Sequence, residues 1–243
     1  MSIPKIIHYV WVGGNLKSKD IQRCMKTWKK HLKDYEIIEW NERNFDINQN
    51  QYCKEAYEAK KWAFVTDYVR LKVLYDYGGI YMDSDVEVCK SLDDFRQYNW
   101  FSGFESINKI PTGTMGSCWN GEVIKLLLDD YNDRHFIKDD GSYDITTNVE
   151  TITKILSKEY DVLLNNTRQV FGDRNILFPF DYLCAKDLMD GKIKVSINTY
   201  TIHHFAGSWL TPWLVRRHKL KIFLVHIFGS EFVNVMKKLF LNR

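Results

Sequence analysis

The sequence predicts an α/β domain built around a parallel sheet. Two observations lead to this prediction: the strand and helix patterns of the first 40 residues, and a long helix in the middle of the chain. Residues 5–12 (KIIHYVWV) are β-branched and aromatic and lead into a Gly-Gly pair, which is typical of a buried strand followed by a turn. Residues 18–32 place apolar side chains at helical spacing, and residues 35–40 (YEIIEW) indicate a second strand. A strand, a helix and a strand at this spacing form a βαβ unit, whose two strands are parallel.

The strongest predicted helix covers residues 61–77, because apolar side chains such as Trp62, Val65 and Val69 recur there at helical spacing and a Gly-Gly pair closes it. A strand is expected to follow at once over residues 80–88 (IYMDSDVEV). The remaining predicted strands are residues 100–104, 162–164, 170–171, 193–195 and 200–205, and the remaining predicted helices are residues 51–60, 122–131, 148–158 and 214–241.

Composition limits the class of protein. The 243 residues suit one large domain with an appendage, so we expect a main domain over residues 1–211 and a helical extension over residues 212–243. Hydrophobic residues, at 45%, supply a core, whereas 27% charged residues exclude a polytopic membrane protein. With only 4 Pro and 13 Gly, collagen-like and low-complexity chains are also excluded.

The five cysteines indicate a reduced, cytoplasmic protein. Their number is odd and no CxxC pair occurs, so neither a disulfide framework nor a zinc ribbon is expected. The first residues lack the charged start, the apolar run and the cleavage site of a signal peptide. No apolar run approaches the ~18 residues that cross a bilayer.

The net charge of +3 is unevenly distributed. Residues 212–243 contain seven basic residues and one acidic residue, so this tail carries +6 and residues 1–211 carry −3. A basic, apolar helix on a mildly acidic body suits an anionic membrane surface better than nucleic acid, and predicts a peripheral position on the inner face of the membrane. The alternative is that the apolar residues of the tail pack on the main domain or on a second subunit.

Two carboxylates two residues apart are the most informative feature. Asp83 and Asp85 interrupt the apolar run of residues 80–88, and in an extended segment they would face the same side. Like charges at that distance repel unless a cation lies between them, and Mg²⁺ and Mn²⁺ prefer oxygen ligands. The pair therefore indicates a divalent metal site, with an ordinary solvated surface pair as the alternative.

Charged and imidazole side chains elsewhere suit the same site. Asp67 and Arg70 share one face of the predicted helix, either as a surface ion pair or as an acid for hydroxyl groups beside a clamp for an anion. His203 and His204 end the last predicted strand, where a histidine could be structural or a third metal ligand.

Three blocks of the sequence together resemble glycosyltransferase family 32. They are residues 3–14 (IPKIIHYVWVGG), residues 62–88 (WAFVTDYVRLKVLYDYGGIYMDSDVEV) and residues 202–209 (IHHFAGSW), and the resemblance covers about residues 3–210. The family contains DXD sugar transferases of capsular and cell-wall polysaccharides and yeast outer-chain mannosyltransferases, with the clostridial glucosylating toxins as distant relatives. It implies a GT-A fold, a Rossmann-like α/β domain with a mixed sheet that uses a nucleotide-sugar donor and Mn²⁺ or Mg²⁺.

The resemblance also implies roles for individual residues. For the donor, Val10 and Trp11 would hold the base, and Asp67 and Arg70 the sugar and diphosphate. The other residues implied for donor binding are Tyr81, Asp83, Asn148, Ser208 and Trp209. Those implied as metal ligands are Asp83, Asp85 and His204, and those implied as catalytic are Asp67, Arg70, Asp83, Asp85 and Trp209. Glu105 would lie on the acceptor side by its position.

The expected function is metal-dependent transfer of a hexose from a nucleotide sugar, with UDP donors favoured, to a hydroxyl of a glycan or lipid-linked glycan in polysaccharide or capsule synthesis. The family retains the anomeric configuration. No residue presents itself as a nucleophile, so same-face attack is favoured and double displacement stays open. The alternatives are a sugar-nucleotide hydrolase and a non-catalytic carbohydrate-binding protein on a transferase fold.

Overall fold

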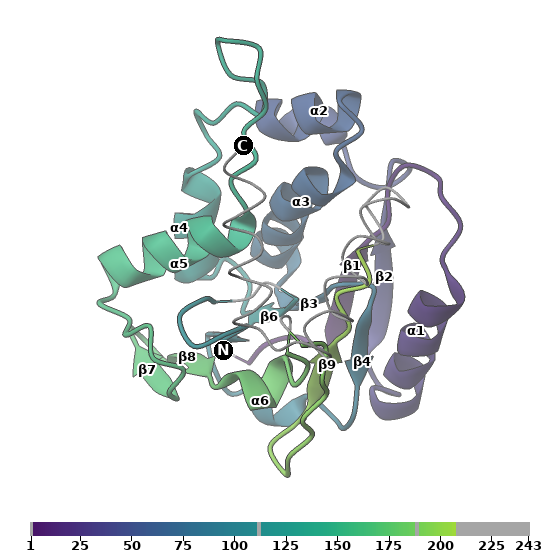
Figure 1. Ribbon diagram of the computed structural model, residues 1–243, viewed down its shortest axis with the longest axis vertical. Helices are drawn as coiled ribbons and strands as arrows, with labels where there is room; N and C mark the ends of the chain where they lie inside the picture. The colour runs from purple at the N-terminus through teal and green to yellow at the C-terminus, as the bar shows by residue number, and fades with distance from the viewer. Residues whose placement is uncertain (1, 111–112, 188–189, 208–243) are drawn as a thin grey trace, which may run out of the picture.

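The computed structural model describes residues 2–110, 113–187 and 190–207 (Figure 1). Within these residues, the main sheet has seven strands in the order β2-β1-β3-β6-β5-β8-β7. The strands are β1 (Ile6–Val10), β2 (Glu36–Trp40), β3 (Gly79–Met82), β5 (Trp100–Gly103), β6 (Thr114–Ser117), β7 (Gln169–Phe171) and β8 (Asn175–Phe178). A second sheet pairs β4 (Val86–Val88) with β9 (Thr201–His203).

The main sheet is mixed. Strand β1 runs parallel to β2 and β3, and β5 runs parallel to β8, whereas β6 is antiparallel to β3 and β5, and β7 is antiparallel to β8. The βαβ unit and the α/β class predicted from the sequence are confirmed, and so is the mixed sheet that the GT-A resemblance implied.

Helices cover both faces of the sheet (Figure 1). Helix α1 (Lys19–His31) lies on one face, and its first turn is capped because the Ser18 hydroxyl accepts from the Ile21 N–H at 3.3 Å. Helices on the other face are α2 (Gln51–Glu58), α3 (Trp62–Tyr77), α4 (Glu122–Asp129) and α5 (Asn148–Glu159). The short helices η1 (Ile47–Gln49), η2 (Asp93–Phe95) and α6 (Phe180–Leu183) lie in connections.

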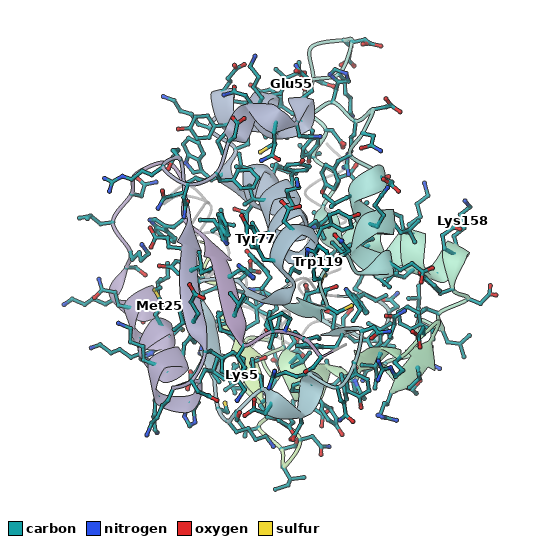
Figure 2. The ribbon with its side chains drawn as sticks, turned by 180° about the vertical axis from the view of Figure 1, so that it is seen from behind. Lys5, Met25, Glu55, Tyr77, Trp119 and Lys158 are labelled. Atoms are coloured by element: carbon teal, nitrogen blue, oxygen red, sulfur yellow. The ribbon has the colours of Figure 1, made fainter. Side chains whose placement is uncertain are left out.

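A hydrophobic core lies on each face of the main sheet. Successive side chains of β3 point alternately into one core and the other. Ile80 and Met82 point into the core under α1, where Trp28 is fully buried and Met25 packs at the edge (Figure 2). Tyr81, between them, points into the core under α3. This alternation places the Tyr81 ring on the same side of the sheet as the α3 side chains.

The single strand expected over residues 80–88 was wrong. The chain leaves β3 at Met82, turns through Asp83-Ser84-Asp85 and resumes as β4 in the second sheet. The Val86 N–H donates to the Asp83 carbonyl at 3.0 Å, which closes the turn. The two carboxylates thus lie where the chain passes from one sheet to the other.

Other differences concern short, irregular segments. Residues 162–164 and 193–195 are not strands, because only an isolated bridge from Ile193 to Lys186 forms there. Strands β6 and β8 were missed, since each is four residues long and β6 contains Gly116. The predicted helix 214–241 lies outside the described residues. Among the described helices, none combines the length and apolar character required to cross a membrane.

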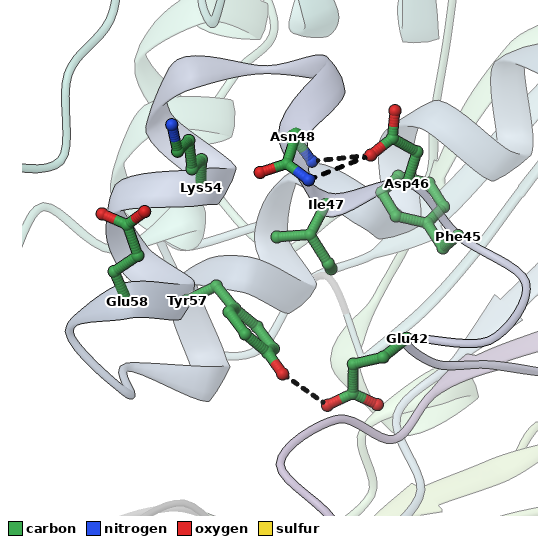
Figure 3. Close-up of a pocket in the computed structure, with 8 residues that line it drawn as sticks. All are labelled: Glu42, Phe45, Asp46, Ile47, Asn48, Lys54, Tyr57 and Glu58. Atoms are coloured by element: carbon green, nitrogen blue, oxygen red, sulfur yellow. Dashed lines mark hydrogen bonds between the residues drawn. The ribbon is translucent and has the colours of Figure 1, made fainter.

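Helix α2 holds the loop that follows β2 (Figure 3). The Tyr57 hydroxyl donates to a Glu42 carboxylate oxygen at 3.2 Å, while Phe45 and Ile47 are buried beneath it. This contact joins the loop after β2 to the last turn of α2.

Candidate functional site

The candidate site lies at the edge of the sheet where β1 and β3 end. These strands are parallel neighbours, so Trp11 and Asp83, which follow them, emerge at the same edge. The Asp83 N–H donates to the Gly113 carbonyl at 2.8 Å, and the His204 N–H donates to the Asp85 carbonyl at 3.2 Å. Backbone hydrogen bonds therefore fix the turn that carries both aspartates against β6 and the end of β9.

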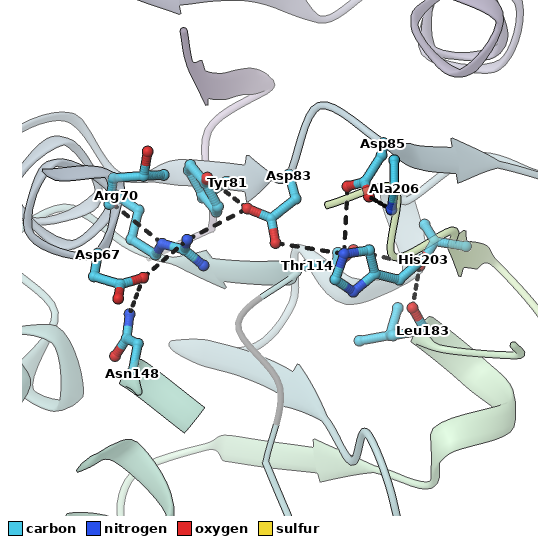
Figure 4. Close-up of polar contacts among 12 residues, drawn as sticks. Asp67, Arg70, Tyr81, Asp83, Asp85, Thr114, Asn148, Leu183, His203 and Ala206 are labelled. Atoms are coloured by element: carbon cyan, nitrogen blue, oxygen red, sulfur yellow. Dashed lines mark hydrogen bonds and ion pairs between the residues drawn. The ribbon is translucent and has the colours of Figure 1, made fainter. Parts of the chain in front are cut away.

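A buried polar network connects α3 to this turn (Figure 4). One Arg70 nitrogen lies 3.1 Å from Asp67 Oδ1 and 3.4 Å from Asp83 Oδ1. The guanidinium also stacks on the Tyr81 ring at 4.7 Å, and the Tyr81 hydroxyl donates to Asp83 Oδ1 at 2.7 Å. The pairing of Asp67 with Arg70 is thus a buried contact within a larger network, not the exposed ion pair that was the alternative.

Burial and neighbouring charges shift the pKa values of the side chains in this network. Desolvation raises the pKa of Asp67 to about 6, although the neighbouring Arg70 opposes the shift. Burial would lower the pKa of Arg70, but Asp83 and the other neighbours raise it above its ordinary value. Burial also raises the pKa of Tyr81 well above its ordinary value, so its hydroxyl keeps its proton and donates to Asp83.

Asp85 contacts residues at the end of β9 and just after it, rather than residues of α3. Its Oδ2 accepts the Ala206 N–H at 2.6 Å, and its Oδ1 lies 3.3 Å from His203 Nε2. The same nitrogen lies 3.7 Å from Asp83 Oδ2. Burial tends to raise the pKa of Asp85, but the His203 ring and the Ala206 N–H outweigh it and lower the pKa to about 2.

A divalent cation is the cofactor that the resemblance implies, and the donor chemistry here fits one. Asp83 and Asp85 each bind a protein donor through one oxygen and turn the other toward His203 Nε2. Carboxylate oxygens suit Mg²⁺ and Mn²⁺, and neutral imidazole is a common metal ligand. Among the described residues, no group of three or more His, Cys, Asp or Glu side chains is placed so that it could hold a metal ion as it stands, so the fit is one of donor chemistry.

The resemblance implied His204 as the third metal ligand, and the structure places the two neighbouring histidines against different partners. His203 lies beside the aspartates, whereas His204 Nε2 lies 2.8 Å from Glu87 Oε2, on the other side of β9. Neighbours in an extended strand do point to opposite sides, but which one faces the site depends on the register of β9 against β4, where His203 pairs with Val86. The sequence does not contain that register.

Histidine substitutions test this geometry. Because only His203 faces the aspartates, His203→Ala is expected to weaken Mn²⁺ binding at least about 10-fold. His204→Ala, which removes a contact to Glu87, is expected to change it by less than about 3-fold. Calorimetric titration of folded variants with Mn²⁺ measures both, and a larger effect at His204 would contradict the assignment.

The base-binding end predicted from the resemblance lies at the end of β1. Val10 is buried, and the Trp11 N–H continues the pairing with β2 by donating to the Trp40 carbonyl at 2.9 Å. The half-buried Trp11 indole donates to the Asn15 carbonyl at 2.7 Å, and Lys17 Nζ lies 5.1 Å from the centre of its ring. The indole is therefore fixed in orientation.

Asn148 lies at the start of α5 and reaches the same network. Its Nδ2 lies 3.4 Å from Asp67 Oδ1, and its Oδ1 is buried without a hydrogen-bond partner among the described residues. Asp67 and Asn148 are thus brought together, with an acceptor available to a hydroxyl. Ser208 and Trp209 lie outside the described residues.

Comparison with known proteins supports the resemblance. Residues 18–102 match the family model described as a glycosyltransferase sugar-binding region containing a DXD motif. The chain is 29% identical over 111 residues to subversion of eukaryotic traffic protein A of Legionella pneumophila, covering 35% of this chain and 17% of that protein. It is 30% identical over 119 residues to inositol phosphoceramide mannosyltransferase 3 of Schizosaccharomyces pombe, covering 47% of this chain and 33% of that protein.

Among solved structures, the PaToxG glycosyltransferase superposes with a TM-score of 0.47 at 19% identity, over 65% of this chain and 69% of that one. This chain covers less than two thirds of the length of either curated relative, the Legionella protein or the Schizosaccharomyces mannosyltransferase. The matched region of the family model contains Asp67, Arg70, Asp83 and Asp85. The resemblance is confirmed at that level: residues 18–102 of this chain match the model of a glycosyltransferase sugar-binding region of the DXD type.

Proposed function

We propose that this chain is a metal-dependent, retaining glycosyltransferase that moves a hexose from a nucleotide sugar to a hydroxyl of a glycan or lipid-linked glycan. The observation that carries the proposal is the continuous polar network from Asp67 through Arg70 and Asp83 to Asp85 and His203. At one edge of an α/β sheet, it combines the buried positive charge of Arg70, buried hydrogen-bond acceptors, and carboxylate and imidazole groups of the kind that bind metal ions. These are the groups that a sugar diphosphate requires.

Arg70 supplies fixed positive charge to the departing diphosphate. Negative charge grows on the diphosphate as the glycosyl–oxygen bond breaks, and preorganised donors in a site of low dielectric stabilise that charge most effectively. Asp67, Asp83 and Tyr81 hold the guanidinium in one orientation, so little reorganisation is needed during the reaction.

Asp83, Asp85 and His203 would hold the divalent cation. When bound, that ion supplies Lewis-acid neutralisation of the diphosphate. The Tyr81 hydroxyl and the Ala206 N–H occupy one oxygen of each aspartate, which keeps both carboxylates in a defined orientation.

The sugar itself would be bound by Asp67 and Asn148. The Asn148 Oδ1 that lacks a partner among the described residues can accept from a sugar hydroxyl, and Asp67 offers a second acceptor beside it. Retention follows when the acceptor hydroxyl attacks from the side of the leaving phosphate, which can take its proton. Trp209, as implied by the resemblance, would add a donor to the leaving oxygen.

A thermal-shift screen of nucleotide sugars with Mn²⁺ tests the proposal. A donor that binds only the folded state at 100 times its Kd stabilises that state by about 2.7 kcal/mol. The expected result is a rise in melting temperature with at least one nucleotide sugar, accompanied by release of its nucleoside diphosphate. Binding without turnover would instead indicate a carbohydrate-binding protein, and turnover to free sugar alone would indicate a hydrolase.

Trp11 provides a separate prediction about the base. If the base stacks on this indole, Trp11→Ala should remove about 1–3 kcal/mol of binding free energy, which raises the Kd of the nucleotide about 5- to 150-fold. Turnover of saturating donor should change less. The matched control is Trp119→Ala, because the Trp119 side chain is 55% exposed and follows β6, whose last residue Ser117 pairs with Gly79 at the start of β3, at the edge of the sheet opposite the site. Unchanged nucleotide affinity in a folded Trp11→Ala variant would exclude the stacking role.

A further inference from the structure

The segment that joins α6 to β9 projects from the rest of the molecule and exposes aliphatic side chains (Figure 1). Within it, residues 192–198 (KIKVSIN) alternate basic and apolar side chains as far as Val195. Ile193 is 46% exposed, Val195 64% and Ile197 90%. Among the described residues, no other run of five consecutive positions contains three exposed large apolar side chains. Such a concentration is typical of a contact surface, whereas single exposed apolar residues are common on any protein.

Hydrogen bonds fix the backbone of residues 192–198. The Lys194 N–H donates to the Ala185 carbonyl at 2.8 Å, so the segment lies against the chain that leaves α6. The Thr199 N–H donates to the Ser196 carbonyl at 3.2 Å, which closes a turn that contains Ile197. The Ser196 N–H in turn donates to the Thr199 hydroxyl at 2.9 Å. The apolar side chains are therefore presented by a hydrogen-bonded backbone.

Lysines are exposed beside these apolar side chains. Lys192 and Lys194 are exposed, and Lys90 reaches the same segment by donating to the Ile197 carbonyl at 2.6 Å. The nearby acids are half-buried, and each accepts a hydrogen bond from this part of the chain; they are Asp181, Asp187 and Asp190. The Lys192 ammonium lies 3.8 Å from Asp190, a distance at which an exposed pair contributes little. The outward charge of residues 192–198 is therefore positive.

The size and composition of this surface favour a lipid partner over a protein partner. Stable protein interfaces bury about 800 Å² on each side, and they are enriched in Trp, Tyr and Arg and depleted in Lys. Residues 192–198 offer three aliphatic side chains and two lysines, without an aromatic residue or an arginine. Aliphatic side chains can enter the boundary between headgroups and acyl chains, while neighbouring lysines extend to anionic headgroups.

We propose that residues 192–198 insert into the surface of an anionic membrane, with the three aliphatic side chains below the headgroups and the two exposed lysines among them. The membrane prediction made from the sequence rests on the tail of residues 212–243, whereas this surface belongs to the main domain. The segment leads directly into β9, whose last residue is His203. The contact would therefore hold the candidate site close to the membrane.

Co-sedimentation of the full chain with lipid vesicles tests the proposal. The vesicles contain phosphatidylcholine alone, or phosphatidylcholine with about one third phosphatidylglycerol, which supplies anionic headgroups. The triple variant Ile193→Ser, Val195→Ser, Ile197→Ser should bind the anionic vesicles at least about 10-fold more weakly, because the burial of three aliphatic side chains is lost. The double variant Lys192→Gln, Lys194→Gln should bind them at least about 5-fold more weakly at low salt and lose less at high salt.

The matched control is the triple variant Leu16→Ser, Leu163→Ser, Val170→Ser. These side chains are 96%, 62% and 57% exposed but lie outside the segment, so binding to the anionic vesicles should stay within about 3-fold of the wild type. Thermal unfolding checks that each variant is folded.

Three results would overturn the membrane contact of residues 192–198: a wild type that does not bind the anionic vesicles, a triple variant of the segment that binds as well as the wild type, or a control that loses as much binding. Binding through the tail alone gives the second of these results. An unchanged lysine variant would overturn the preference for anionic lipid. Because sedimentation does not measure turnover, the proposed function is decided separately.

Discussion

Asp85→Asn is expected to reduce nucleotide-sugar turnover by at least about 10³-fold while leaving the protein folded. A metal ion stabilises the charge of the transition state by several kcal/mol, and each 1.36 kcal/mol is tenfold in rate. The asparagine retains an oxygen for the Ala206 N–H, so the backbone contact at the end of β9 survives. It loses the charge that faces His203, which we propose as a metal ligand.

Donor turnover at saturating Mn²⁺ measures the effect, with thermal unfolding as the test of folding. The matched control is Asp76→Asn, because Asp76 forms a half-buried pair with Lys72 in the last turns of α3 and should leave turnover unchanged. A folded Asp85→Asn variant that turns over normally would contradict the role given to this carboxylate.

Arg70→Met is expected to lower the free energy of unfolding by about 3–5 kcal/mol and to abolish turnover. Arg70 is 5% exposed and pairs with Asp67 and Asp83, so its removal leaves buried carboxylates without their counter-charge. The pKa of Asp67, already raised to about 6, should rise further. Because the folded state then binds a proton that the unfolded chain has released, the loss of stability should grow as the pH rises from 6 to 8.

Urea denaturation at both pH values measures this loss. Arg23→Met is the control, because Arg23 is exposed and lies 3.6 Å from the exposed Asp20, so its removal should cost less than about 1 kcal/mol. The double variant Asp67→Asn, Arg70→Met should recover part of the stability but none of the turnover. An Arg70→Met variant as stable as the wild type would show that the network is not the buried charge cluster described above.

The fold was predictable where a periodic pattern is long. Residues 6–40 and α3 carry enough apolar side chains at regular spacing to identify a strand or a helix without tertiary context. Strands β6 and β8 have only four residues each, so neighbours across the sheet decide their conformation. The break between β3 and β4 was missed for a related reason: the alternation on either side continues through Asp83-Ser84-Asp85, and only the pairing of β4 with β9 reveals the change of sheet.

For the candidate site, the sequence identified residue types better than it identified their contacts. The spacing of three residues predicted that Asp67 and Arg70 share one face of the helix. The structure adds Asp83 and Tyr81 to the same network. The choice between His203 and His204 depends on a strand register formed by residues more than 100 positions apart.

The release of nucleoside diphosphate from a panel of nucleotide sugars, with Mn²⁺ and then with excess EDTA, tests the central claim most directly. The network of Arg70, Asp83 and Asp85 predicts release from at least one donor with Mn²⁺ and its loss in EDTA, with recovery when Mn²⁺ is restored. Full release in excess EDTA, or no release from any donor with Mn²⁺, would contradict the account.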